Sequence, residues 1–222
     1  MIISHKNKFV FVKTTKTAGT SVEIALSGSC GDEDILSKLH PTDEAIRLER
    51  SGRGSQNVAV TKADKVFRFD PHTRGKRARA YLGRAEFAKY FSFAFERNPF
   101  DRVVSAYFYI KKMREQRGED TSEFTFDAMV GKQSHLKQLH DRGWGLYTDQ
   151  DEIFVTKVYK FEELQTAMAD IVKQIGLPET VELPHTKTSS RSRDYRDYYS
   201  SESRAAVEEV FAQELATFGY SF

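Results

Sequence analysis

The chain has 222 residues, with 34 lysines and arginines against 32 aspartates and glutamates, a formal net charge of +2. This length suits one α/β domain with a sizeable core, and the balanced charge argues against wholesale nucleic-acid binding. The single cysteine, Cys30, cannot form an internal disulfide, which favours a reducing compartment. No apolar run approaches the ~20 residues of a membrane span, so we predict a cytoplasmic protein with neither a nucleic-acid nor a membrane partner.

The first predicted elements are a strand over Phe9–Val12 and a helix over Thr20–Leu26. The turn between them contains Lys16 and Gly19. A glycine lets the backbone approach an anion, the start of a helix offers N–H groups and hydroxyls, and a lysine supplies a mobile positive charge. The pattern predicts a phosphate cradle, related to a Walker A loop but lacking that motif's first glycine. The alternative is an ordinary strand, turn and helix with a solvated lysine.

The next predicted helix follows Pro41, with Thr42 as its cap and Ile46 and Leu48 on its apolar side. A short strand over Lys65–Phe69 comes after it. Turn residues and charged side chains dominate the sequence between these elements, and they carry no pattern that identifies a ligand.

A helix that closes at Gly83 follows the short strand. Six lysines and arginines from Arg68 to Arg84 stand against the single Asp70, and four from Lys187 to Arg196 stand against the single Asp194. Both patches suit a small polyanionic ligand, although a solvated charged face is the default interpretation.

A buried strand is predicted over Phe91–Phe95, and a long helix follows it. Asn98 is a good N-cap and Pro99 favours the first helical position, so the helix begins there and extends to about Arg114. Asp101, three residues after the cap, completes a box-like start.

Arg97 stands at the junction of this strand and helix. Because ligands of open parallel sheets bind at the carboxyl ends of strands, we expect Arg97 to point into the same crevice as Lys16. Ser105 lies about 10 Å further along the helix axis, within reach of a ligand lying along that helix. The two predict a second anion site. In the alternative, Arg97 pairs with Asp101 and Ser105 merely packs.

The remaining sequence alternates between irregular and regular segments. Residues 117–150 are polar, with short helices near 126–130 and 134–139, and suit a substrate-side lid. A strand over Ile153–Tyr159, a helix over Glu162–Ile175 and a last helix over Ser201–Phe218 follow. Strands alternating with helices predict an α/β protein, a P-loop-type three-layer fold whose mainly parallel central sheet is flanked by helices. We predict one domain over residues 1–222.

Two motifs carry a resemblance to a known family. Lys16-Thr-Ala-Gly-Thr-Ser21, followed by Arg97-Asn-Pro-Phe-Asp-Arg-Val-Val-Ser105-Ala-Tyr, resembles the PAPS-dependent sulfotransferases, particularly their carbohydrate-type branch. The likeness extends to Tyr159-Lys-Phe-Glu-Glu-Leu164 and to the ending Phe218-Gly-Tyr-Ser-Phe222. It implies 3′-phosphoadenosine 5′-phosphosulfate (PAPS) as donor, adenosine 3′,5′-bisphosphate (PAP) as product, no metal, and a hydroxyl of a carbohydrate or other small acceptor, less often an amine.

The resemblance also implies roles for individual residues. Lys16 is similar to the lysine that neutralises the leaving phosphate, and Arg97 with Ser105 to the pair that holds the 3′-phosphate. The 5′-phosphate cradle would comprise Thr17, Ala18, Gly19, Thr20 and Ser21. The segment containing Lys187, Ser189 and Arg191 is similar, more loosely, to a late loop that covers the donor.

Transfer to a hydroxyl requires a base that removes the acceptor's proton, and we predict that His72 is this base. It follows a short strand and precedes a basic helix, on the expected ligand side, and imidazole titrates near neutral pH. The segment from Pro71 to Gly83 resembles the family stretch that places a histidine before a helix ending in Leu-Gly. Its alternative is a structural histidine. Glu23 is the second candidate, since some relatives use a glutamate, although we favour a solvated helix carboxylate.

The sequence departs from the family pattern at two places. Many relatives carry His-x-Pro before the lysine, whereas this chain has Lys13-Thr-Thr15, which places an additional positive charge near the cradle. Glu96 stands where an apolar residue is usual, and strand alternation predicts that its side chain turns away from the ligand.

Two other functions remain open: a P-loop small-molecule or nucleoside kinase, and a nucleotide-binding protein without catalysis. The missing Walker A glycine and the lack of a clear Mg²⁺-holding carboxylate motif weigh against the kinase. The acceptor's identity and the oligomeric state have no readable signal.

Overall fold

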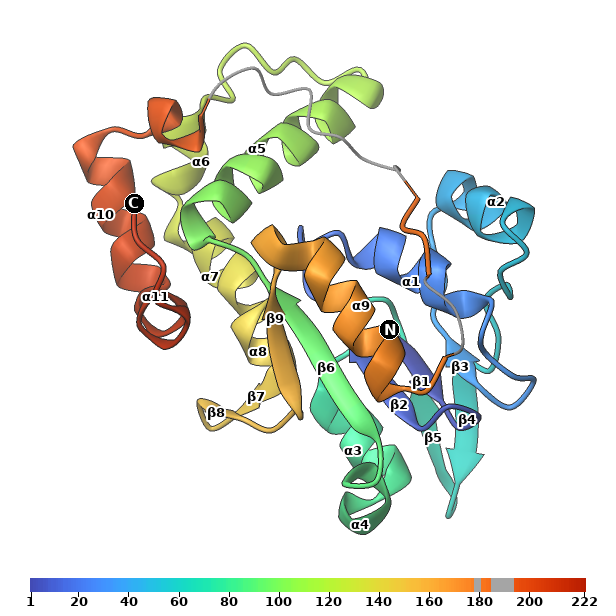
Figure 1. The fold of residues 1–222 in the computed structure, drawn as a ribbon. Helices are drawn as coiled ribbons and strands as arrows, with labels where there is room; N and C mark the ends of the chain where they lie inside the picture. Colours follow the sequence, from blue (N-terminus) through green and yellow to red (C-terminus); the bar gives the residue numbers. More distant parts are fainter. Residues whose placement is uncertain (178–180, 185–193) are drawn as a thin grey trace. The chain divides into compact units, whose positions relative to one another are not determined.

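The computed structural model describes residues 1–177, 181–184 and 194–222 (Figure 1). The chain divides into two compact units, each made of two segments. Unit 1 comprises Met1–Glu96 and Trp144–Lys187, and unit 2 comprises Arg97–Gly143 and Thr188–Phe222. A single domain over the whole chain and a lid over residues 117–150 stay predictions.

Unit 1 contains a five-stranded sheet in the order β3-β1-β2-β6-β9. Its strands are β1 (Ile2–Ser4), β2 (Phe9–Val12), β3 (Ile35–Leu36), β6 (Phe91–Glu96) and β9 (Lys157–Lys160). Strand β6 pairs in parallel with both β2 and β9, whereas β1 pairs antiparallel with β2 and β3. Four strands therefore run in one direction, which confirms the mostly parallel sheet. Strands β1 and β3 were not predicted.

One face of the sheet is aromatic. Alternate residues of a strand share a face, so Phe9 and Phe11 of β2 join Phe93 and Phe95 of β6 in one core cluster. The rings of Phe11 and Phe93 stack at 5.1 Å between centroids. Helices α1 (Gly19–Ser27) and α9 (Leu164–Gln174) supply the other side of this cluster, in front of the sheet in Figure 1.

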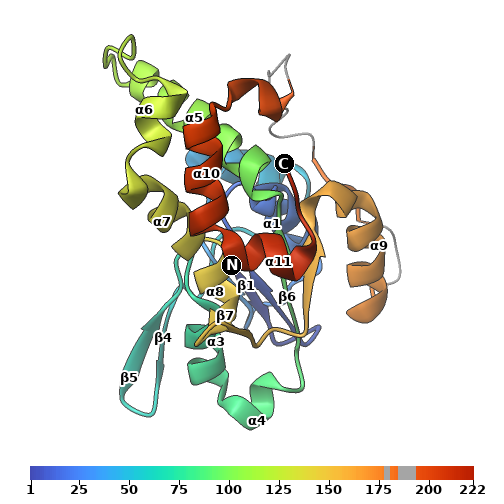
Figure 2. The ribbon, with the colours of Figure 1, turned by 90° about the vertical axis from the view of Figure 1, so that its left-hand side faces the viewer.

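The opposite face is covered by α3 (Gly75–Leu82), whose first residue lies against the strands. A Cβ added at Gly75 would come within 2.9 Å of both Val12 and Phe154, so only glycine permits this close approach. Helices α4 (Arg84–Phe87) and α8 (Trp144–Tyr147) extend this layer. Figure 2 shows α3 and α9 on opposite sides of the sheet, which confirms the three-layer α/β fold.

The predicted strand over Lys65–Phe69 does not join the central sheet. It forms β5 (Lys65–Arg68), which pairs antiparallel with β4 (Ala59–Lys62) in a separate hairpin. The connecting residues, Ala63 and Asp64, have φ of 48° and 60°, as a tight hairpin turn requires. The predicted strand over 153–159 is likewise shorter, because a second hairpin, β7 (Thr148–Asp149) with β8 (Glu152–Ile153), precedes β9.

Helix α2 (Pro41–Glu49) forms where predicted but buries different residues. Leu48 is 57% exposed, whereas Arg47 is fully buried and donates to the carbonyl of Ser37 at 3.4 Å. The N-cap is His40, whose ring hydrogen-bonds the hydroxyl of Thr42 at 2.9 Å. The Thr42 cap and the burial of Leu48 were therefore wrong, whereas Ile46 is half-buried. The helix buries Arg47 beside Leu48, with the guanidinium on a backbone carbonyl.

Unit 2 is helical. It contains α5 (Pro99–Gln116), α6 (Phe126–Val130), α7 (Gln133–Asp141), the short 3₁₀ helix η2 (Tyr195–Tyr198), α10 (Ser201–Val210) and α11 (Ala212–Phe218). Helix α5 begins as predicted, since the Asn98 side chain accepts from the Phe100 N–H at 3.0 Å. The predicted last helix is broken at Phe211, where φ is −106° and ψ is 22°.

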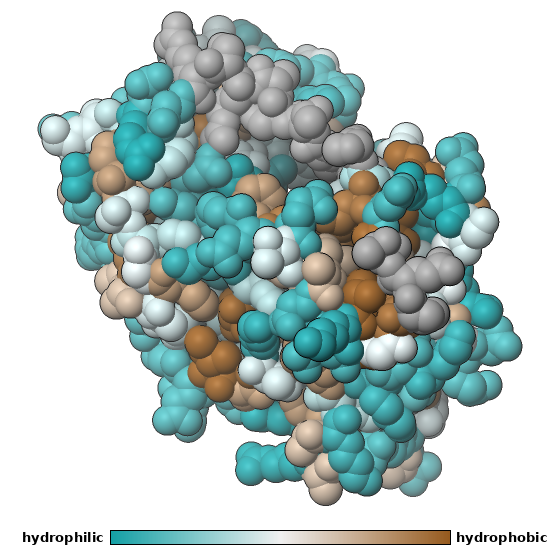
Figure 3. All heavy atoms as spheres, in the orientation of Figure 1, coloured by the Kyte–Doolittle hydropathy of each residue, from teal (hydrophilic) through white to brown (hydrophobic). Residues whose placement is uncertain are grey.

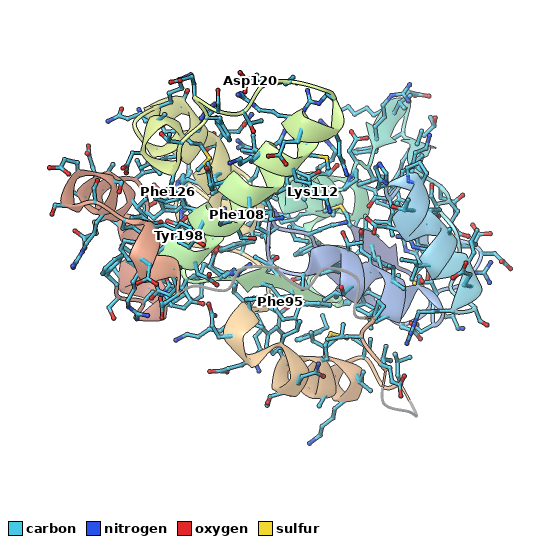
Figure 4. The ribbon with its side chains drawn as sticks, turned by 90° about the horizontal axis from the view of Figure 1, so that it is seen from above. Phe95, Phe108, Lys112, Asp120, Phe126 and Tyr198 are labelled. Atoms are coloured by element: carbon cyan, nitrogen blue, oxygen red, sulfur yellow. The ribbon has the colours of Figure 1, made fainter. Side chains whose placement is uncertain are left out.

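Aromatic side chains fill much of unit 2. Phe108 packs edge-on against Tyr198 with 5.3 Å between ring centroids, and Phe126 lies 6.2 Å from the same tyrosine. Figure 4 shows Phe108 on α5 with Phe126 and Tyr198 close to it. The apolar part of the cluster continues into Val103 and Phe211.

On the face drawn in Figure 3, hydrophilic residues predominate and hydrophobic ones form small separate groups. Across the described ranges, every helix is too short or too polar to span a bilayer.

Candidate functional site

The loop after β2 has the backbone of an anion cradle. Lys16 and Ala18 adopt left-handed conformations, with φ of 67° and 57°. Such residues cost about 1–3 kcal/mol each and persist only where the surrounding structure enforces them. Left-handed residues interspersed with right-handed ones direct successive backbone N–H groups into a concavity that binds anions. The left-handed conformations thus occur at the lysine and an alanine rather than at Gly19.

Two buried threonine hydroxyls stabilise the cradle loop through hydrogen bonds. The Thr14 hydroxyl donates to the carbonyl of Phe95 at 2.5 Å, which anchors the loop to β6. It also hydrogen-bonds the Thr17 hydroxyl at 2.7 Å, and both side chains are buried. The hydroxyl of Thr17 therefore belongs to the support of the loop.

Helix α1 begins at Gly19, with Ala18 as its N-cap. A methyl side chain cannot accept a hydrogen bond, and the first turn carries no acidic residue. Neither a capping side chain nor an acidic residue of that turn thus offsets the positive end of the helix dipole, a feature that suits an anion. Thr20 is half-buried and Ser21 is buried at this end.

Lys13 and Glu23 form a buried ion pair beneath the loop. Lys13 Nζ lies 2.5 Å from Glu23 Oε2, and Glu23 is fully buried. The other carboxylate oxygen accepts from the Ser37 hydroxyl at 2.8 Å and from the amino group of Met1. Burial alone would raise the pKa of Glu23, but the Met1 amino group and Lys13 lower that pKa to about 2.

This pair revises two expectations. Glu23 is not a solvated helix carboxylate, because it is buried and carries a structural ion pair. The additional positive charge at Lys13 is balanced by that carboxylate. Glu23 as the base stays an alternative prediction, which these contacts disfavour.

His72 lies against the start of the cradle loop. Its Nδ1 is 3.0 Å from the carbonyl oxygen of Lys13. A carbonyl only accepts, so Nδ1 carries the hydrogen and donates, and the lone pair of the neutral ring lies on Nε2. The structure therefore brings His72 next to the loop that contains Lys16.

Arg97 and Ser105 belong to unit 2. Arg97 follows β6 directly and is 8% exposed, with its Nε 2.7 Å and its Nη2 2.5 Å from Asp101 Oδ2. This is the pairing that the alternative interpretation expected. Ser105 is half-buried in α5.

The neighbouring Glu96 is fully buried and accepts from the Tyr147 hydroxyl at 2.7 Å. The negative charge that the sequence places beside Arg97 is therefore directed into unit 1.

The structure divides the predicted site residues as follows. Unit 1 holds Lys16, Thr17, Ala18, Gly19, Thr20, Ser21 and His72, and unit 2 holds Arg97 and Ser105. Lys187, Ser189 and Arg191 lie outside the described residues. Within the described part of the chain, no group of three or more histidines, cysteines or carboxylates could hold a metal ion.

The role of Lys13 as the partner of Glu23 was not predicted from the sequence. A signal was present, because Glu23 stands three residues before Leu26 and so shares a side of the helix with that apolar residue. A carboxylate buried in a helix needs a cationic or hydrogen-bonding partner, and Lys13 is the nearest preceding charge apart from Lys16.

Comparisons with known proteins give one family. The model of the sulfotransferase family matches residues 1–221. An uncharacterized protein of Archaeoglobus fulgidus is 30% identical over 105 residues, which cover 46% of this chain and 81% of that protein. The crystal structure of a sulfotransferase from Alicyclobacillus acidocaldarius aligns with 97% of this chain and 96% of its own, at 17% identity and a TM-score of 0.44.

Proposed function

The chain belongs to the sulfotransferase family, and we propose that it moves the sulfuryl group of PAPS to a hydroxyl of a carbohydrate or other small acceptor. The observation that carries this proposal is the cradle: two left-handed residues, Lys16 and Ala18, lead into a helix that begins without a capping side chain or an acidic first turn. A phosphosulfate needs such N–H donors and a nearby cation.

Lys16 would be the cation of the cradle. Of the two lysines in the loop, Lys13 is 6% exposed and ion-paired with Glu23, whereas Lys16 is half-buried within the left-handed segment. A lysine there acts as a mobile point charge for an anionic ligand.

The residues have complementary roles in an in-line displacement. His72 Nε2 would take the proton of the acceptor hydroxyl while the acceptor oxygen bonds to sulfur. Lys16 and the first N–H groups of α1 would stabilise the electron pair that the 5′-phosphate oxygen retains when its bond to sulfur breaks. The acceptor gains the sulfuryl group, and the proton remains on His72 until solvent removes it.

Arg97 and Ser105 would hold the 3′-phosphate. The Asp101 carboxylate orients the guanidinium of Arg97, and a planar guanidinium can bind a phosphate through two parallel hydrogen bonds. We keep Lys187, Ser189 and Arg191 as residues that would cover the donor.

The test is calorimetric titration of the protein with PAP and, in parallel, with ADP and with ATP plus Mg²⁺. We expect tight, metal-independent binding of PAP alone, followed by transfer of labelled sulfate from PAPS to a hydroxyl acceptor in a panel. Preference for ATP with Mg²⁺ would point to the kinase. Binding of PAP without transfer to any acceptor would point to a nucleotide-binding protein, and binding of none of these nucleotides would refute the proposal.

A further inference from the structure

We propose that the Lys13–Glu23 ion pair is a clasp that holds the cradle loop in its anion-binding conformation and sets the position of His72. Lys13 is then a positioning residue and not a ligand of the donor. The functional part of this inference rests on the proposed sulfuryl transfer.

The clasp joins the two ends of the loop. Lys13 is the first residue after β2, and Glu23 lies one turn inside α1. The 2.5 Å contact between Lys13 Nζ and Glu23 Oε2 therefore closes the segment that contains both left-handed residues. Glu23 is itself held by the Ser37 hydroxyl at 2.8 Å and by the amino group of Met1, so the clasp is anchored to the edge of the sheet.

The stem of Lys13 also determines why residue 19 is glycine. A Cβ at Gly19 would lie 2.6 Å from Lys13 Cγ and 3.4 Å from its Cδ and Cε. A left-handed backbone does not explain the glycine, because the φ of Gly19 is not positive. Because Glu23 fixes the far end of the lysine, the stem cannot move aside easily. The first residue of α1 is therefore packed directly on Lys13.

The backbone of Lys13 makes the third contact. Its carbonyl oxygen accepts from His72 Nδ1 at 3.0 Å. One residue thus touches the start of α1, the buried carboxylate and the proposed base. A displacement of Lys13 would change both the cradle and the orientation of the imidazole.

The alternative is that Lys13 binds phosphate directly. Its side chain is almost completely buried, and its charge is compensated at 2.5 Å by Glu23. To reach a ligand, the ammonium group would have to leave a buried carboxylate behind, which is unfavourable.

A double-mutant cycle distinguishes these roles. Lys13→Met keeps the stem beside Gly19 but removes the charge, and Glu23→Gln removes the carboxylate charge. We expect each single variant to weaken PAP binding about tenfold or more. The double variant should bind PAP no worse than the single variant with the lower affinity, because all three variants lose the same ion pair. If Lys13 were a direct ligand, Glu23→Gln would keep or improve affinity and Lys13→Met alone would lose it. That result would overturn the proposal.

A second measurement needs no nucleotide. In ¹⁵N NMR spectra of the imidazole, wild-type His72 should show the Nδ1–H tautomer, and Lys13→Met should shift it toward Nε2–H. Lys16→Met is the matched control, expected to weaken PAP binding while leaving the His72 tautomer unchanged. If Lys13→Met lowers only the melting temperature and leaves affinity and tautomer as in wild type, the pair has a purely structural role and the proposal is wrong.

A third measurement uses only the wild-type protein, so it does not depend on whether the variants fold. The Lys13 ammonium group should exchange its protons slowly and keep its ¹⁵N shift when PAP binds, whereas the Lys16 signal should move. A Lys13 signal that moves as much as that of Lys16 would refute the clasp. If the wild-type protein failed to bind PAP, that result would count against the proposed function and not against the clasp. The tautomer of His72 is measured without nucleotide and still tests the clasp.

Discussion

His72 donates its Nδ1 hydrogen to the carbonyl oxygen of Lys13, 3.0 Å away. A hydrogen bond therefore links the histidine to the cradle loop and places the basic lone pair on the other ring nitrogen. This relationship gives the proposed base a defined tautomer.

Replacement of His72 should reduce the chemical step without abolishing donor binding. A general base contributes roughly 10²–10⁴-fold, so we expect His72→Asn to lower kcat by about that factor while PAP affinity stays within about threefold. Asparagine can still donate to the Lys13 carbonyl, whereas His72→Ala cannot. A larger loss of PAP affinity in the alanine variant than in the asparagine variant would measure the positioning effect. Unchanged kcat in both variants would exclude His72 as the base.

Arg97→Ala should weaken PAP binding by about 1.5–3 kcal/mol, the usual contribution of a charged hydrogen bond, and leave ADP binding nearly unchanged. ADP lacks the 3′-phosphate that we assign to Arg97. Calorimetry with both nucleotides gives the comparison. Asp101→Asn is the control, because it removes the charge paired with Arg97 but keeps the guanidinium. Equal losses for PAP and ADP in Arg97→Ala would contradict the assignment.

Local chemistry predicted much of the fold. The strand over Phe9–Val12 and the helix after Asn98-Pro99 form where the sequence indicates, because a short apolar run and a capping residue are local features of the sequence. The β4 strand was missed because Ala59–Lys62 is largely exposed and offers no apolar pattern. Pairing with β5, not burial, stabilises it.

Buried charges limited prediction of the site. The sequence predicted the position of the cradle, but it favoured a solvated carboxylate at Glu23, because the partners Lys13 and Ser37 lie outside the helix that carries Glu23. The sequence also carried no sign of the left-handed residues: glycine adopts that conformation most readily, yet Lys16 and Ala18 adopt it here. Tertiary contacts enforce this choice, and spacing alone does not reveal them.

Acid should reveal the ion pair of Glu23. Its pKa is lowered from 4.5 to about 2 in the folded protein, so its contribution to stability is complete above 4.5 and is lost as the pH falls toward 2. This pKa shift corresponds to a contribution on the order of 3 kcal/mol to the free energy of unfolding. Urea unfolding of wild type and Glu23→Gln between pH 6 and pH 2.5 should show the larger decrease in wild type. Parallel curves would mean that the carboxylate is not ionised at its buried position.

The His140–Glu214 pair of unit 2 should act in the opposite direction. His140 Nδ1 lies 2.9 Å from the fully buried Glu214, and this hydrogen bond raises the pKa of His140 above 6.5 despite partial burial. The charged histidine therefore stabilises the fold fully below pH 6.5, and that contribution is lost as the pH rises through the raised pKa. We expect the midpoint of urea unfolding to fall between pH 6 and pH 8.5 in wild type and to change less in His140→Gln. NMR titration of His140 gives the pKa directly, and a value at or below 6.5 would contradict the pairing.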